Sequence, residues 1–137
     1  MSSFRIFDIA GSGMSAQSVR LNTVASNLAN AESVSGDPAQ VYRAKHPVFQ
    51  AVQPATADPA GSGVKVLGIT ESTAEPLRRY EPGNPLADPQ GYVYAPSVNV
   101  VEEMVDMISA SRAYQNDVEV MNTARNLMLA TLKLGQS

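Results

Sequence analysis

The sequence predicts a mainly α protein in which an N-terminal and a C-terminal helix pair as an antiparallel coiled coil, with a small β-rich or irregular insert between them. Both ends of the chain carry apolar residues at the three- and four-residue spacing of one helix face. The prolines instead concentrate between residues 32 and 96, where short alternating runs predict strands. We therefore divide the chain into a helical segment, 1–33, an insert, 34–96, and a long helix, 97–137. The first and last segments are expected to form one coiled-coil domain.

The N-terminal helix is expected over residues 4–31. Its apolar positions follow a heptad pattern, interrupted only at Gln17: Phe7, Ala10, Met14, Leu21, Val24, Leu28 and Ala31. Because Gly11 and Gly13 each lower helix propensity by about 1 kcal/mol, we expect a firm helix from Met14 and a bent or frayed one before it. The polar side is rich in Ser, Asn and Gln, which cost less to desolvate than charged side chains. This composition favours a subunit interface over the alternative of a weakly amphipathic, solvated helix.

The insert contains four short runs in which strands or extended segments are expected: 41–43, 48–52, 64–69 and 91–94. The segment 54–63 is rich in Pro, Gly and Ala and predicts a flexible loop. The segment 81–91 carries three prolines, which exclude a helix or a central strand there. An insert of this size is marginal as an independent domain.

The C-terminal helix is expected over residues 100–134, a stretch without proline. Asn99 stands where an N-cap is expected, and Glu102 follows three residues later, as in a capping box. At the rise of an α-helix this segment is about 50 Å long, whereas the N-terminal apolar stripe spans only about 36 Å. Part of its wide apolar face therefore has no partner within the chain, which predicts polymerisation or the binding of another protein.

The composition excludes several classes of function. The net charge is -3 and no run of Lys or Arg is present, which argues against nucleic-acid binding. The chain has no cysteine, which rules out disulfides and thiol chemistry. No apolar run approaches the roughly 18 residues of a membrane span, so we expect no direct membrane insertion. The N-terminus also lacks the apolar core of a cleaved signal peptide.

No residue pattern predicts an active site. His46 is the only histidine and has no carboxylate or thiol near it in the sequence. Ser12 lies in a Gly-Ser-Gly triplet without the strand-to-helix context of a hydrolase serine. Glu102, Glu103 and Asp106 suit the dipole of a helix start, and no further ligand is spaced to complete a metal site. We therefore predict a protein that is not an enzyme, with no catalytic, cofactor-binding or metal site and no cofactor.

Three stretches resemble a known family. Residues 12–33, SGMSAQSVRLNTVASNLANAES, match an apolar helix that ends in SNxANxxT, with Ser33 in place of the usual Thr. Residues 42–49, YRAKHPVF, match a YR-x-K-x-x-x-F segment. Residues 78–125, RRYEPGNPLADPQGYVYAPSVNVVEEMVDMISASRAYQNDVEVMNTAR, match a long and nearly unbroken pattern. Together they resemble the bacterial flagellar rod, hook and related axial proteins, and the last stretch resembles the proximal rod proteins among them.

The resemblance implies a structural subunit of the basal-body proximal rod. That rod is a hollow helical drive shaft that transmits torque from motor to hook, surrounds the export channel and supports flagellum-dependent motility. The terminal helices would form the inner layer of the tube. The implied location is the rod in the periplasmic space, reached through the flagellar type III export apparatus without a cleaved signal peptide. The implied partners are other copies of the chain, other proximal rod proteins, the rod-base adapter and the distal rod protein.

If the two apolar stripes pair within a subunit and pack between subunits, specific residues of both helices make the contacts. The expected helix and subunit contacts are Met14, Leu21, Val24, Asn27, Leu28, Asn30, Met104, Met107, Arg112, Tyr114, Asn116, Val118, Met121 and Met128. In the insert, a rigid turn is expected at Tyr80, Pro82, Gly83, Asp88, Gly91 and Tyr92. The alternative is a soluble coiled-coil adaptor or binding module, linked to type III secretion, that does not polymerise.

Overall fold

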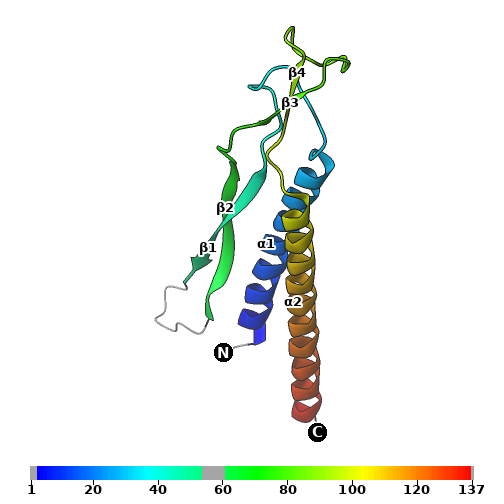
Figure 1. The fold of residues 1–137 in the computed structure, drawn as a ribbon. Helices are drawn as coiled ribbons and strands as arrows, with labels where there is room; N and C mark the ends of the chain where they lie inside the picture. The colour runs from blue at the N-terminus through cyan, green and yellow to red at the C-terminus, as the bar shows by residue number, and fades with distance from the viewer. Residues whose placement is uncertain (1–2, 54–60, 137) are drawn as a thin grey trace.

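The computed structural model describes residues 3–53 and 61–136, and within them the chain forms an elongated molecule (Figure 1). Its elements, in chain order, are α1 (Ser3–Ala29), β1 (Lys45–Val52), β2 (Gly63–Glu71), β3 (Leu77–Tyr80), β4 (Tyr92–Ala95) and α2 (Val100–Gly135). Helices α1 and α2 lie side by side and run in opposite directions (Figure 1). Strands β1 and β2 lie along α1, and β3 and β4 lie at the end of the molecule remote from both chain termini.

The predicted fold class, a helix-dominated coiled coil with a small insert, is wrong. The described residues form two helices and four antiparallel strands in two small sheets, so that about half are helical and about a fifth are in strands. The reason is that β1 and β2 are long enough, at 8 and 9 residues, to run beside α1 as a hairpin. Helix α1 therefore packs against a sheet as well as against α2.

The β1–β2 hairpin has a regular antiparallel register, from Lys45 opposite Glu71 to Val52 opposite Gly63. A β-bulge between Val48 and Phe49 shifts the register by one residue, which increases the local twist of the ribbon. The loop predicted over 54–63 falls mostly on residues 54–60, which lie outside the described residues. The hairpin thus extends further along α1 than the short runs in the sequence predicted.

The second sheet pairs β3 with β4, from Leu77 opposite Ala95 to Tyr80 opposite Tyr92. Tyr94 also exchanges two backbone hydrogen bonds with Ser35, at 3.0 and 2.8 Å, which joins this sheet to the segment that follows α1. After β4, Asn99 caps α2 as predicted, since its side chain accepts from the backbone N–H groups of Val101 and Glu102. The small sheet therefore connects the end of α1 to the start of α2.

The core consists mainly of small side chains. The buried apolar residues are Ala10, Ala16, Val24, Val41, Ala44, Val93, Ala95, Ala110 and Ala124. Alanines at these positions allow backbones to approach closely, while the larger Met, Leu and Tyr side chains lie at the edges of the contacts. None of the helices in the described part of the chain has an apolar stretch long enough to cross a membrane.

Helix α1 is continuous from Ser3 to Ala29, so the predicted bend or fraying before Met14 is not observed. Close packing against α2 explains why the helix has a glycine at position 13. A Cβ atom at this position would lie 2.6 Å from Oδ2 of Asp117, on α2, and 3.0 Å from its Cγ. Gly11, two residues earlier in the helix, has no such neighbour within 4 Å. The close approach of α2 compensates for the lower helix propensity of Gly13.

Replacement of the two glycines by alanine separates propensity from packing. We expect Gly11→Ala to stabilise the chain by about 1 kcal/mol, because it raises helix propensity and meets no other atom. Gly13→Ala gains the same propensity but must displace the Asp117 carboxylate, so its net effect will be smaller or destabilising. Urea unfolding of the purified variants measures both effects. Equal stabilisation by the two substitutions would contradict the close contact between α1 and α2.

Candidate functional site

The residues of α1 predicted to make helix or subunit contacts differ in burial. Val24 and Asn27 are buried, whereas Met14, Leu21, Leu28 and Asn30 are half-buried. The stripe of larger residues is therefore only partly covered, whereas the small residues Ala10 and Ala16 of the same helix are buried. The amide of Asn30 donates to Ser26 O at 2.9 Å, so in this chain it makes a contact within its own helix.

The predicted contact residues of α2 divide into two sets. Met107, Tyr114, Val118, Met121 and Met128 are half-buried. Met104, which is 53% exposed, and the exposed Arg112 and Asn116 lie away from the buried side of the helix. The structure thus brings most of the apolar set towards α1 and leaves the two polar residues on the open surface.

The most buried residues of α2 are Glu103, Ala110 and Ala124, which were absent from the predicted set. With the half-buried residues they form one line at alternating four- and three-residue steps: Glu103, Met107, Ala110, Tyr114, Asp117, Met121, Ala124 and Met128. Sequence reasoning identified the four large members of this line but not Glu103, Ala110, Asp117 and Ala124, because it followed large apolar side chains. The heptad spacing of the two alanines was the available signal.

A salt bridge between the helices was also missed. Arg20 on α1 donates to Asp106 on α2, with 2.9 Å between Nη2 and Oδ1. Asp106 had been assigned to the dipole at the start of α2. Because both side chains are partly exposed, this pair contributes little net stability, but it does align the two helices.

Exposed apolar side chains lie on α2 where α1 does not cover it: Val101, Met104, Val105, Ile108, Val120 and Leu127. An open groove of about 440 Å³ lies on α2 around Val105 and Ile108. A second, of about 520 Å³, lies at the margin of the helix pair, where Ile6 of α1 lines it together with Val120 and Leu127. Arg112 lines one groove, and Asn116 lines both. The end of α2 extends past the start of α1 (Figure 1), and there Leu129, Leu132 and Leu134 are also exposed.

The predicted insert turn is built around Asp88 and Gly91. The Asp88 carboxylate accepts from the backbone N–H groups of Gln90, at 2.9 Å, and Tyr92, at 2.8 Å. Gly91 has φ 87°, which favours glycine, and a Cβ there would lie 3.0 Å from the ring of Tyr80. These contacts explain why this turn requires Asp and Gly at these positions.

Aromatic packing holds the two strands beside this turn together. The rings of Tyr80 and Tyr92 lie 5.1 Å apart, and the guanidinium of Arg78 lies 3.6 Å from the centre of the Tyr92 ring. Pro82 contacts the turn, since a Cβ on Gly91 would lie 3.1 Å from its Cβ. Gly83 is exposed, and a Cβ there would have no neighbour within 4 Å, so nothing in the structure requires glycine at that position.

Comparison with known proteins bears on what these surfaces are for. The family described as flagella basal body rod protein matches residues 7–36, and that described as flagellar basal body rod FlgEFG protein C-terminal matches residues 90–134. The flagellar basal-body rod protein FlgC of Salmonella typhimurium is 57% identical over 136 residues, covering 99% of this chain and 100% of the relative. The chain belongs to the FlgC family of flagellar basal-body rod proteins.

More distant relatives with the same name extend this similarity. FlgC of Yersinia enterocolitica is 56% identical, covering 99% of this chain and all of the relative, and FlgC of Aquifex aeolicus is 42% identical over 97% of each chain. As a member of the FlgC family, the protein is a structural subunit of the flagellar basal-body rod rather than an enzyme. The two matched family regions contain most of α1 and all but the end of α2.

The contact between Asp117 and Gly13 places a carboxylate in the line of α2 that faces α1. Desolvation by burial raises the pKa of Asp117 above its ordinary value of 3.8. The folded chain therefore holds this proton to a higher pH than the unfolded chain does. It follows that Asp117 lowers the stability of the fold as pH rises from 3.8 through its raised folded pKa, and that the full penalty persists at neutral pH.

We expect Asp117→Asn to remove this penalty, because the neutral amide has nearly the same shape. The variant should exceed the parent in stability at neutral pH, and the difference should shrink as pH falls towards 3.8. Thermal unfolding of the purified chains over a series of pH values measures this difference. Asp8→Asn, an identical charge change at an exposed position of α1, serves as the control. A loss of stability in Asp117→Asn at neutral pH would contradict the argument.

Proposed function

We propose that the protein forms, with other copies of itself, part of the hollow proximal rod that transmits torque from motor to hook and surrounds the export channel. Assembly with other rod components follows from its place in the FlgC family. The observation that carries the proposal is the open face of α2. A helix of 36 residues packs on α1 along one line and leaves apolar side chains exposed near its start, from Val101 to Ile108, and again from Val120 towards its end.

Burial of the exposed apolar side chains of α2 would add stability that the isolated chain lacks. Each Val, Ile or Leu side chain yields roughly 1.5–3 kcal/mol when it is fully removed from water. Val105, Ile108, Val120 and Leu127 lie exposed on a rigid helix, so burying them requires little further ordering. Lateral contact between neighbouring subunits along α2 would therefore be favourable, and many parallel contacts of this kind make a stiff cylinder. Arg112 and Asn116, which border the grooves, would supply polar contacts between subunits.

The finer assignment of partners and location forms part of the same proposal. The neighbours are the other proximal rod proteins, the rod-base adapter and the distal rod protein. The subunit reaches the periplasmic part of the rod through the flagellar type III export apparatus, without a cleaved signal peptide.

A substitution on the open face tests the proposal. Leu127 is 62% exposed and lines the larger groove, so Leu127→Asp should leave the fold of the isolated chain intact. We expect the variant to be synthesised normally, to be absent from purified basal bodies and to abolish motility in soft agar. Asn126→Asp adds the same charge at the adjacent exposed position, outside both grooves, and should remain motile. Normal incorporation of Leu127→Asp into the rod would show that this face is not an assembly surface.

A further inference from the structure

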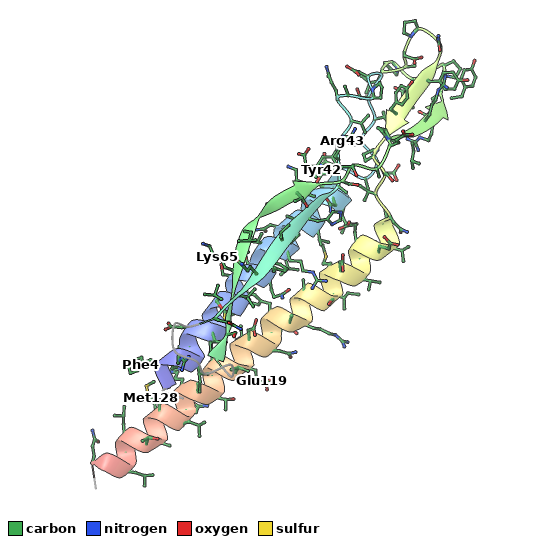
Figure 2. The ribbon with its side chains drawn as sticks, turned by 90° about the vertical axis from the view of Figure 1, so that its left-hand side faces the viewer. Phe4, Tyr42, Arg43, Lys65, Glu119 and Met128 are labelled. Atoms are coloured by element: carbon green, nitrogen blue, oxygen red, sulfur yellow. The ribbon has the colours of Figure 1, made fainter. Side chains whose placement is uncertain are left out.

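The β1–β2 hairpin is placed by α1 alone. Both strands lie along α1, and in the described part of the chain neither strand comes within 8 Å of α2 between Cα atoms (Figures 1 and 2). A two-stranded hairpin is only marginally stable by itself in water. Its position beside the helix must therefore come from specific contacts with α1, and the structure shows a polar contact at each end.

The first contact is made by Asn27, near the end of α1, which is fully buried. Its Nδ2 donates to Lys45 O at 2.9 Å, and its Oδ1 accepts from Lys45 N at 2.8 Å. The side-chain amide thus pairs with the first residue of β1 as a neighbouring strand would, through one donor and one acceptor. This pairing fixes both the position of β1 along α1 and its orientation.

A tyrosine completes this contact. The Tyr42 hydroxyl donates to Asn27 Oδ1 at 2.8 Å, and Ser26 Oγ lies 3.0 Å from the same hydroxyl. Because the Tyr42 hydroxyl hydrogen is used for Asn27, Ser26 is the donor in the second bond. Tyr42 lies where the chain enters the hairpin, close to the end of α1 (Figure 2). Two consecutive residues of α1 therefore bind the segment that leads into β1.

The second contact is made by Ser12, about four helical turns earlier. Its Oγ accepts from the backbone N–H of Val64, in β2, at 3.1 Å, and donates to Ile9 O at 2.7 Å. A glycine on the hairpin makes this approach possible, since a Cβ on Gly63 would lie 3.1 Å from Ser12 Oγ. One contact thus binds the start of β1 and the other the start of β2, at opposite ends of the hairpin.

We propose that Asn27 and Ser12 form a two-point lock that holds the β1–β2 hairpin on α1, so that helix and hairpin enter the rod as one rigid body. Between the two points, Ala16 and Thr23 are buried and fall on the same face, since residues 12, 16, 23 and 27 follow the spacing of a single helical line. Displacement of the hairpin along the helix would therefore break both polar contacts. Only the motility readout below rests on the rod function of the protein.

A disulfide tests the docked geometry directly. A Cβ on Gly63 would lie 3.8 Å from the Cβ of Ser12, the separation found in disulfides, about 3.8 Å. The natural chain has no cysteine, so the double variant Ser12→Cys/Gly63→Cys contains a single possible pair. We expect mild oxidation of the purified full-length chain to form the intramolecular bond in nearly all molecules, as measured by intact mass after thiol alkylation. Failure of the bond to form would overturn the docked arrangement.

The rate at which the Ser12→Cys/Gly63→Cys disulfide forms also measures how much Asn27 contributes to docking of the hairpin. Asn27→Asp replaces the donor to Lys45 O with a second oxygen and buries a charge, so it should slow disulfide formation by about tenfold or more. Asn22→Asp, the same change at an exposed position of α1, should alter the rate by less than about twofold. Tyr42→Phe removes one hydroxyl without burying a charge, and should slow the reaction to an intermediate degree. An unchanged rate in both Asn27→Asp and Tyr42→Phe would refute the lock.

Rescue distinguishes a lock from a general role of Asn27 in folding. We expect Asn27→Asp alone to reduce motility, and the oxidised Ser12→Cys/Gly63→Cys pair to restore it, because a covalent link replaces the lost polar contact. Asn27→Asp with Ser12→Cys alone should not be restored. If the disulfide forms and motility stays low, Asn27 has another role and the proposal fails. If every variant forms the disulfide as expected while Leu127→Asp assembles normally, the lock stands and the proposed assembly surface fails.

Discussion

Helix α1 is covered on two faces at once, and this double burial determines how the other elements can be arranged. The triplet Gly11-Ser12-Gly13 shows the constraint at one turn of the helix. The Ser12 hydroxyl reaches the hairpin at Val64, while the backbone at Gly13 lies against the Asp117 carboxylate of α2. A larger residue at position 12 would displace the hairpin, and a larger residue at position 13 would displace α2. Small side chains along both faces, such as Ala10 and Ala16, maintain the same close approach.

The two helices consequently differ in how much of their surface the rest of the chain covers. Helix α1 has the hairpin on one side and α2 on the other, whereas α1 is the only described helix or strand that packs against α2. Exposed apolar side chains therefore remain along α2 and at the end that extends past α1 (Figure 1), while others lie on the hairpin, among them Phe49 and Leu67. For a structural rod subunit this division is useful, because the part that fixes internal shape is separate from the part that is free to contact neighbours. The groove around Val105 and Asn116 lies on that free surface.

Local features of the fold could be predicted from the sequence where they depend on neighbouring residues. The N-cap at Asn99 and the length of the C-terminal helix follow from short-range hydrogen bonding and from the absence of proline. The turn at Asp88 and Gly91 follows from the backbone conformations that these residues favour.

The fold class could not be predicted in the same way, since it depends on contacts between distant segments. Nothing in the segment around Asn27 indicates that its amide pairs with Lys45, because that contact requires the hairpin to lie along α1. The small residues of α2 that meet α1 were missed for a related reason. Apolar size is a guide to burial only when helices are separated by large side chains, and here Ala110 and Ala124 bring them closer.

Thiol labelling along α1 tests the double burial most directly, because the natural chain is free of cysteine. Single alanine-to-cysteine variants place a probe on each face of the helix: Ala10 and Ala16, which are 4% and 2% exposed, and the exposed Ala25 and Ala29. In the purified full-length chain we expect a maleimide to label the first two positions more slowly than the last two, by about tenfold or more. Equal rates at Ala16 and Ala25 would show that the hairpin does not cover α1, and would contradict the proposed arrangement of the fold.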